Sequence, residues 1–321
     1  MARIGHHCVG GARSALLLPA LLWMTGCGAA HDLAMAAEGP PSSGDVNPIP
    51  NPTPTPTPTP TPYPLTPGVT LTVLPRSTVD RPDERSGYQV HVIYVVPSDG
   101  VDRQRDVDGE IVRSVYAFDR WFARQTDGLH LRVDTSQAGA VDVSFLRIPE
   151  TDATMVAAGL AEHGRIERAI QAAGFNDPQK IYAVYYEGGN RETCGDGAWP
   201  PRAPGKAGIL YLQGAPGCIQ DPLGSNLRQP QYLDFGMLHE IVHVLGFVAA
   251  CGVHNIVVNG FVTAHITNPL DLMYGGGGLT WHPSQLDAEH TDYFRVSGSH
   301  CLDLSNSAFL EPLPATAEPR P

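Results

Sequence analysis

The sequence has no apolar run long enough to cross a membrane as a mature helix. Its most apolar stretch, ALLLPALLWM at residues 15–24, is far shorter than the roughly 20 residues that a spanning helix needs. Positive charge is also scarce, because 21 Lys and Arg residues face 33 Asp and Glu residues, for a formal net charge of −12. No basic patch is present, so nucleic acid is not expected as a partner.

Cysteine is rare, and no two cysteines of the folded part have the CxxC spacing of a zinc ribbon. Cys8 and Cys27 lie in the N-terminal segment, which leaves four cysteines for the rest of the chain. An even number in an exported domain indicates two disulfides, with three possible pairings. The shortest loops that do not cross favour the pairs Cys194–Cys218 and Cys251–Cys301.

The N-terminal segment 1–27 has the features of a signal peptide, with early arginines followed by the apolar run. It ends in Met24-Thr25-Gly26-Cys27, which resembles a bacterial lipobox, so we expect lipidation at Cys27. The alternative is an ordinary signal peptide cleaved near Ala30 or Ala37. Either reading predicts an exported protein: a cell-surface or periplasmic lipoprotein, or a secreted one. Membrane contact is then expected only through the lipid anchor at Cys27.

Residues 28–68 form a Pro/Thr-rich segment that we expect to be a disordered linker in extended polyproline II conformation. The folded domain is expected at 69–312, with a disordered tail at 313–321. Apolar periodicity predicts strands at 88–96, 129–135, 141–148, 180–186 and 208–212, and helices at 108–126 and 151–173. This order predicts an α+β fold with a mixed β-sheet packed with helices.

The most informative motif is His239-Glu240-Ile241-Val242-His243, in which two histidines are four residues apart. On a helix they share one face, so both imidazoles can bind one metal ion. Glu240 lies where it can accept a proton from water at that metal. This HExxH arrangement is typical of zinc hydrolases, and apolar neighbours on all sides predict a buried helix.

A third protein ligand must complete such a zinc site. Gly246 would let the chain leave the helix sharply, but Ala249 occupies the position at which the compact motif HExxHxxGxxH has its third histidine. His265 is the preferred candidate and His254 the next. His282, His290, Asp271 and Glu289 are weaker alternatives.

The segment Asp271-Leu272-Met273-Tyr274-Gly275 resembles the methionine-containing turn that lies beneath the zinc ligands in metzincins. Together with the HExxHxxG motif it makes the region 233–274 similar to metzincin-type zinc metalloproteases. The chain differs from the compact members by an insertion between Gly246 and the third histidine, as in leishmanolysin-like metzincins. The resemblance extends to a bacterial secreted or lipoprotein branch.

That resemblance implies a zinc-dependent endopeptidase acting on exported or extracellular proteins, with Zn²⁺ held by His239, His243 and His265. Glu240 would be the general base for attack of a zinc-bound water on the scissile carbonyl. The strand at 208–212 is a candidate edge for pairing with an extended peptide. The alternative is a surface-displayed binding protein that keeps the metzincin scaffold but does not hydrolyse peptides.

Overall fold

The computed structural model describes residues 71–214, 222–276, 281–297 and 301–319. The predicted signal peptide and lipobox at 1–27, the linker at 28–68 and Cys218 lie outside these ranges. In the described part of the chain, no helix is both long and apolar enough to span a bilayer.

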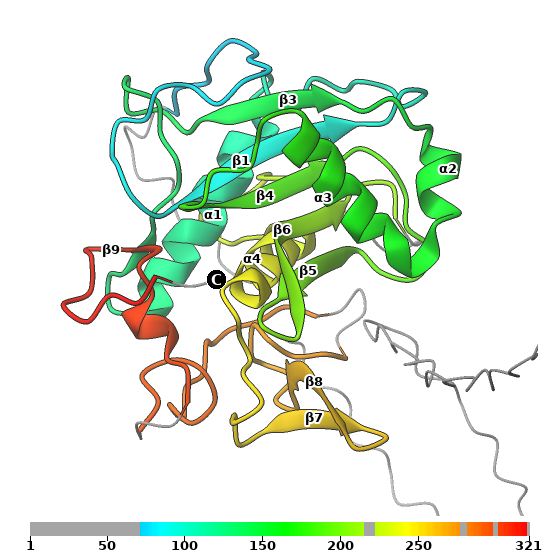
Figure 1. The fold of residues 1–321 in the computed structure, drawn as a ribbon. Helices are drawn as coiled ribbons and strands as arrows, with labels where there is room; N and C mark the ends of the chain where they lie inside the picture. Colours follow the sequence, from blue (N-terminus) through cyan, green and yellow to red (C-terminus); the bar gives the residue numbers. More distant parts are fainter. Residues whose placement is uncertain (1–70, 215–221, 277–280, 298–300, 320–321) are drawn as a thin grey trace, which may run out of the picture.

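A five-stranded sheet in the order β3-β1-β4-β6-β5 forms the centre of the domain (Figure 1). The first four strands in this order are parallel, and β5 runs antiparallel to β6. The strands are β1 (Gln89–Val96), β3 (Val143–Arg147), β4 (Lys180–Tyr186), β5 (Gly195–Trp199) and β6 (Ala203–Tyr211). This mixed sheet, covered by helices, confirms the predicted α+β class.

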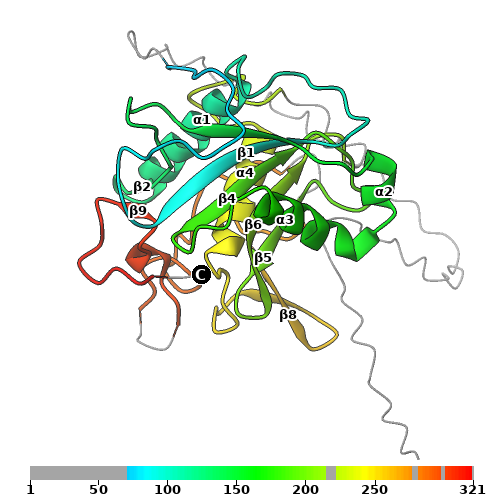
Figure 2. The ribbon, with the colours of Figure 1, turned by 45° about the horizontal axis from the view of Figure 1, so that its top comes forward.

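Both faces of the sheet are buried because its central strands are apolar on both sides. Alternate residues of β1, such as Val92 and Tyr94, face α1 (Glu110–Gln125) and α4 (Tyr232–Val244). The residues between them, such as Ile93 and Val95, face α3 (Glu162–Ala172). Figures 1 and 2 show α3 on the opposite side of the sheet from α1 and α4.

The helix predicted at 151–173 is interrupted. It consists of α2 (Asp152–Val156), the 3-10 turn η1 (Gly159–Ala161) and α3. The interruption lies at Gly159, whose φ of +53° is outside the helical range. The apolar residues keep their helical spacing across this break, so the sequence did not reveal it.

The strand predicted at 208–212 is longer than expected, and it is not an edge. It belongs to β6, which pairs with β4 on one side and with β5 on the other. The edge is therefore β5, which the sequence did not reveal because its Gly-Asp-Gly start has low β-propensity. The prediction that the 208–212 strand could receive a peptide at an open edge was wrong.

Smaller elements lie outside the main sheet. Strand β7 (Asn255–Val258) and β8 (Phe261–Ile266) form an antiparallel hairpin at the bottom of Figure 1, away from the main sheet. β2 (His130–Leu131) pairs with β9 (Leu310–Glu311), so the strand predicted at 129–135 is mostly irregular. The 3-10 turn η3 (Leu304–Asn306) precedes β9.

Two further predictions concern the C-terminal part of the chain. The disulfide Cys251–Cys301 is present, as predicted. Where a disordered tail was expected from residue 313, the chain instead folds back onto the domain. Glu318 donates its backbone N–H to the carbonyl of Asn306, and its own carbonyl accepts from Ala308.

Candidate metal centre

Helix α4 carries the HExxH motif and is buried along nearly its whole length. Its start is fixed by a capping box, in which Gln231 and Asp234 hydrogen-bond each other's backbone N–H groups. Its end is followed by Gly246 at φ +92°, which turns the chain away as predicted. The helix therefore holds the motif rigidly between the sheet and the C-terminal part of the domain.

The helix places His239 and His243 one turn apart, with ring centroids 4.5 Å from each other. Backbone carbonyls orient both rings. Nδ1 of His239 lies 2.7 Å from the oxygen of Leu272, and Nδ1 of His243 lies 2.8 Å from that of Phe247. Since a carbonyl oxygen can only accept, each Nδ1 carries the proton and each Nε2 keeps a free lone pair.

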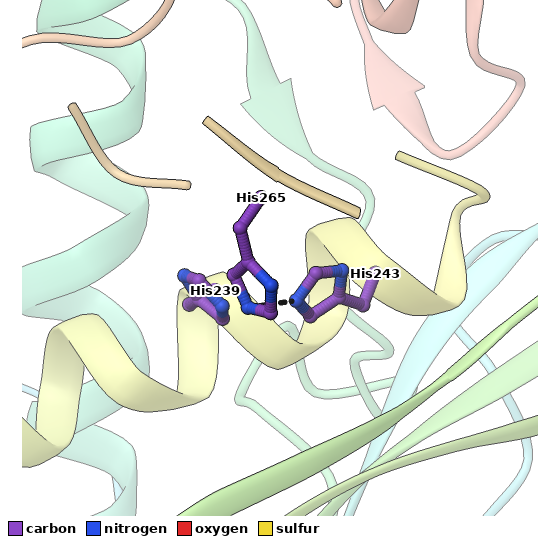
Figure 3. Close-up of side chains that lie close together, drawn as sticks. All are labelled: His239, His243 and His265. Carbon is purple, nitrogen blue, oxygen red and sulfur yellow. Dashed lines mark hydrogen bonds between the residues drawn. The ribbon is translucent and has the colours of Figure 1, made fainter. Parts of the chain in front are cut away.

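His265 reaches the same point from a different element, strand β8 (Figure 3). Its Nε2 lies 3.2 Å from Nε2 of His243, and one nitrogen from each of the three histidines lies within 4.8 Å of the others. A backbone hydrogen bond with Thr263 orients the ring of His265. The structure thus brings together the three histidines that the sequence selected.

The hairpin that delivers His265 is not among the elements predicted from the sequence. The turn lies at Asn259-Gly260, and both residues have positive φ, 51° and 82°. Asn-Gly between apolar residues is the strongest short-range signal for such a turn. This dipeptide could have revealed the hairpin before the structure did.

The three histidines have two features of a metal-binding group: a buried nitrogen that lacks a hydrogen-bond partner among the described residues, and neutral rings. Nε2 of His239 is buried and has no hydrogen-bond partner among the described residues, which is costly for a polar atom. Burial lowers the pKa of His239 to about 3 and that of His265 to about 4, and it holds the pKa of His243 well below its usual range. All three rings are therefore neutral at pH 7, which is the form that binds metal.

The alternative ligands lie elsewhere. His254 is on the surface, where its Nδ1 contacts Asp292 at 2.9 Å, and its side chain is 41% exposed. The side chain of Glu289 is 71% exposed and lies 3.9 Å from His254. His290 hydrogen-bonds the carbonyl of Phe294. In the part of the chain that the structure describes, none of these residues belongs to the group that contains His239.

The turn around Met273 lies directly against the histidines. Met273 is fully buried, and its backbone N–H donates to Asp271 Oδ1 at 2.8 Å. Its carbonyl accepts from Ile266 at the end of β8, next to His265. The carbonyl of Leu272 holds His239, as described above. The turn therefore connects the HExxH helix to the strand that carries His265.

Glu240 is buried next to the histidines, with only 4% of its surface exposed. Within the described ranges no hydrogen bond to its carboxylate is found, and the carboxylate lies against Gly195 and Gly197 of β5. Burial and the charge of Asp196 hold its pKa well above the usual range, while the charge of His163 opposes them. The side chain of Glu240 therefore holds a proton more readily than an exposed glutamate does.

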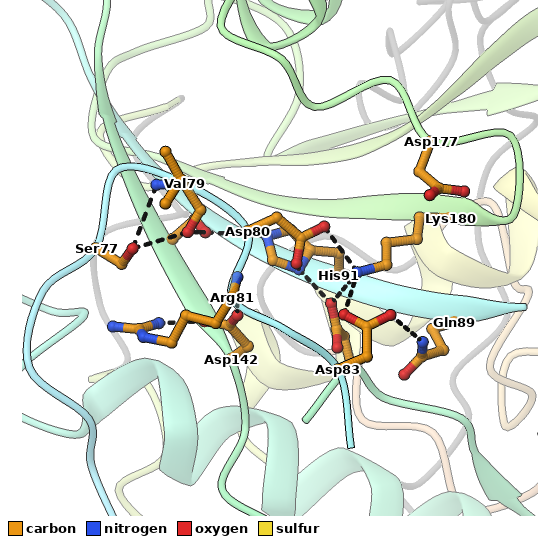
Figure 4. Close-up of polar contacts among 12 residues, drawn as sticks. Ser77, Val79, Asp80, Arg81, Asp83, Gln89, His91, Asp142, Asp177 and Lys180 are labelled. Carbon is orange, nitrogen blue, oxygen red and sulfur yellow. Dashed lines mark hydrogen bonds and ion pairs between the residues drawn. The ribbon is translucent and has the colours of Figure 1, made fainter. Parts of the chain in front are cut away.

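A second group of buried acidic and histidine side chains lies on the far side of the domain and contains Asp80, His91, Asp134 and Asp142 (Figure 4). Two cations already lie inside it. Lys180 Nζ is within 2.8 Å of three carboxylates, and Arg81 pairs with Asp142. We therefore assign this group to holding the segment 77–83 against the sheet.

Comparison with known proteins gave matches in structure only. No protein-family model matches the sequence, and a search of curated proteins found no relative. Among solved structures, archaemetzincin from Methanopyrus kandleri matches with a TM-score of 0.34 and 11% identity, over 62% of this chain and 90% of that one. OgpA from Akkermansia muciniphila matches with a TM-score of 0.36 and 16% identity, over 68% and 63%.

Metalloproteinase-II from Bacteroides fragilis gives a TM-score of 0.30 and 16% identity, over 66% of this chain and 54% of the other. One of the matching structures is catalytically inactive OgpA in complex with an O-glycopeptide substrate. These matches are distant.

Proposed function

We propose that this protein is a zinc-dependent endopeptidase that cleaves peptide bonds of exported or extracellular proteins. The observation that carries the proposal is the convergence of three neutral imidazoles on one point, two of them from the helix that also carries the buried Glu240. Three protein ligands with room for water are the pattern of catalytic zinc sites, whereas structural sites have four.

His239, His243 and His265 would hold the zinc ion. When bound there, zinc supplies a Lewis acid that activates water and polarises the scissile carbonyl. The carbonyls of Leu272 and Phe247 keep Nε2 of His239 and His243 unprotonated and correctly oriented.

Glu240 would be the general base. Its buried carboxylate has a raised pKa, so it readily accepts the proton of the attacking water. The protonated side chain would then donate that proton to the departing amine.

The substrate would bind in extended form along β5, the edge strand beside Glu240. Its inner side pairs with β6, and an extended peptide could add to its outer side through backbone hydrogen bonds. This proposal replaces the 208–212 strand, which lies inside the sheet.

We place the enzyme outside the cytoplasm, either lipidated at Cys27 or released. The disulfide Cys251–Cys301 fits an oxidising compartment, in which such bonds persist. The peptide substrate would then be an exported protein.

The alternative is a binding protein that keeps the scaffold and the metal but does not hydrolyse peptides. Such a protein has no need for a general base, whereas Glu240 is present beside the three histidines. Glu240 therefore favours the enzyme.

The test is digestion of casein or gelatin by zinc-loaded wild-type protein and by the Glu240→Gln variant. We expect the variant to keep zinc and thermal stability and to lose at least about 100-fold in rate. Removal of metal with a chelator should abolish wild-type cleavage, and added zinc should restore it. A wild-type protein that binds zinc but cleaves no substrate would support the binding protein, and an unaffected Glu240→Gln variant would refute the mechanism.

A further inference from the structure

Three glycines lie where helix α4 approaches β5 and β6, and Glu240 occupies the space that their missing side chains leave. A Cβ atom added at Gly195 would collide with Glu240 Oε1 and would lie 2.8 Å from its Cγ. At Gly197 an added Cβ would lie 2.8 Å from His243 Cβ, 2.9 Å from the Glu240 backbone oxygen and 3.0 Å from Glu240 Oε2. At Gly208 it would lie 3.0 Å from the Glu240 backbone carbon and 3.1 Å from Glu240 Cβ. We call Gly195, Gly197 and Gly208 the glycine trough.

The backbone does not explain these glycines. None of the three has a positive φ, and all lie in strands, where glycine weakens the sheet relative to residues with a side chain. Gly197 and Gly208 are direct partners across β5 and β6, so two adjacent strands lack a side chain at the same point. Close approach of α4 at Glu240 and His243 is the remaining physical reason for them.

The residue between the two β5 glycines fixes the strand from its other face. Side chains alternate along a strand, so Asp196 points away from Glu240 and toward α3. There it forms an ion pair with His163 at 3.5 Å, and His163 lies equally far from Glu167. Glu167 accepts the backbone N–H of Lys206 in β6 at 2.7 Å. Helix α3 is thus tied to both strands of the trough.

We propose that the glycine trough and the Asp196–His163 pair position the carboxylate of Glu240 for proton transfer. Gly195 and Gly197 give the carboxylate bare backbone to lie on, and Gly208 admits the backbone of α4 at Glu240. The ion pair holds β5 against α3 from the other face of the sheet. These are positioning residues, because they act through Glu240. The inference rests on the proposed role of Glu240 as general base.

Gly195→Ala is the sharpest test, because the three atoms nearest to its added methyl group all belong to the flexible side chain of Glu240. We expect kcat to fall about 10- to 100-fold because the base is displaced, with unchanged KM, zinc content and melting temperature. Gly164→Ala in α3 is the matched control, since the atom nearest to its added methyl group is a flexible Arg168 nitrogen at 3.3 Å. Equal kcat for Gly195→Ala and wild type would overturn the proposal.

Two measurements separate positioning from general damage. Glu240→Asp shortens the carboxylate arm, so combined with Gly195→Ala it should lose less activity than the two single losses predict. Strictly additive losses would contradict the proposal. His163→Gln should lower kcat several-fold with zinc retained, and an unchanged kcat would refute the role of the ion pair.

A structural readout does not depend on activity. In a crystal structure of the Gly195→Ala protein, the Glu240 carboxylate should have left β5, while His239, His243 and His265 stay in place. A carboxylate that remains on β5 would overturn the positioning role. If the wild type cleaves no peptide, the proposed function fails, and this crystal structure still decides whether the trough places Glu240.

Discussion

At the scale of single residues, the candidate site depends on which nitrogen of each histidine carries the proton. Leu272, Phe247 and Thr263 hold the rings of His239, His243 and His265 through backbone hydrogen bonds. Three carbonyls from three different segments thus set the tautomers, and a metal would find three prepared lone pairs. Side-chain substitution cannot easily remove these carbonyls, so the histidines themselves are the useful targets.

His265→Ala should lower zinc affinity by more than about 100-fold, because two imidazoles and no third ligand remain. His254→Ala is the control, since that histidine contacts Asp292 at the surface and should leave zinc affinity unchanged. Competition with a chromogenic chelator measures both. Loss of zinc in His254→Ala with retention in His265→Ala would contradict the site described here.

At the scale of elements, the candidate metal centre joins a helix to a hairpin. The β7–β8 hairpin has no contact with the main sheet through strand pairing, and its register is set by the Asn259-Gly260 turn. A change at this turn should therefore shift the position of His265, which lies five residues beyond Gly260.

Gly260→Ala should cost about 1 kcal/mol of stability, because φ is +82° there, and it should also weaken zinc binding. Gly128→Ala is a matched control: its φ is +94°, it also has free space around it, and it lies far from the hairpin in the sequence. The control should lose similar stability and keep its zinc affinity. Chemical unfolding and chelator competition together distinguish the two effects.

The contact between α3 and β5 predicts a dependence of stability on pH. Burial lowers the pKa of His163, but the negative charges of Asp196 and Glu167 outweigh it and raise the pKa to about 10. A raised histidine pKa adds stability that is complete below about pH 6.5 and is lost as pH rises toward 10. The full shift from 6.5 to about 10 corresponds to a loss of about 5 kcal/mol.

Urea unfolding of the metal-free protein between pH 6.5 and 10 measures this loss. In His163→Gln that fall in stability should be much smaller, because the titrating group is gone. An equally steep fall in the variant would show that other groups cause it.

At the scale of the whole molecule, the C-terminal part is held together by a disulfide and by buried carboxylates. Cys251 lies in the insertion and Cys301 lies 50 residues later. Asp287 accepts backbone N–H groups of Asp292, Tyr293 and Phe294, and Asp271 accepts from the Tyr293 hydroxyl. These contacts fix the segment that surrounds the metal centre without regular secondary structure.

Replacing both Cys251 and Cys301 by serine should lower the free energy of unfolding by about 4 kcal/mol, the chain-entropy value for a loop of this length. We also expect weaker zinc binding, because the insertion that precedes His265 loses its covalent tie. Urea unfolding and zinc titration measure the two effects. Unchanged stability in the double variant would show that the buried carboxylates suffice.

The sequence by itself determined those features that depend on local periodicity. The spacing of His239 and His243 places both on one helix face whatever surrounds the helix, and the buried strands β1 and β4 follow from unbroken apolar runs. The motif around Met273 and the position of His265 before it were also enough to select the third histidine. Each of these features depends on residues that are close along the chain.

Only the tertiary structure decided those features that depend on contacts between residues far apart in the sequence. The meeting of His265 with His243, 22 residues earlier, requires a hairpin to dock on a helix, and sequence spacing does not encode that docking. The edge position of β5 and the packing of Glu240 on its glycines likewise arise when separate elements meet. Local geometry supplied the ligands, and long-range packing brought them together.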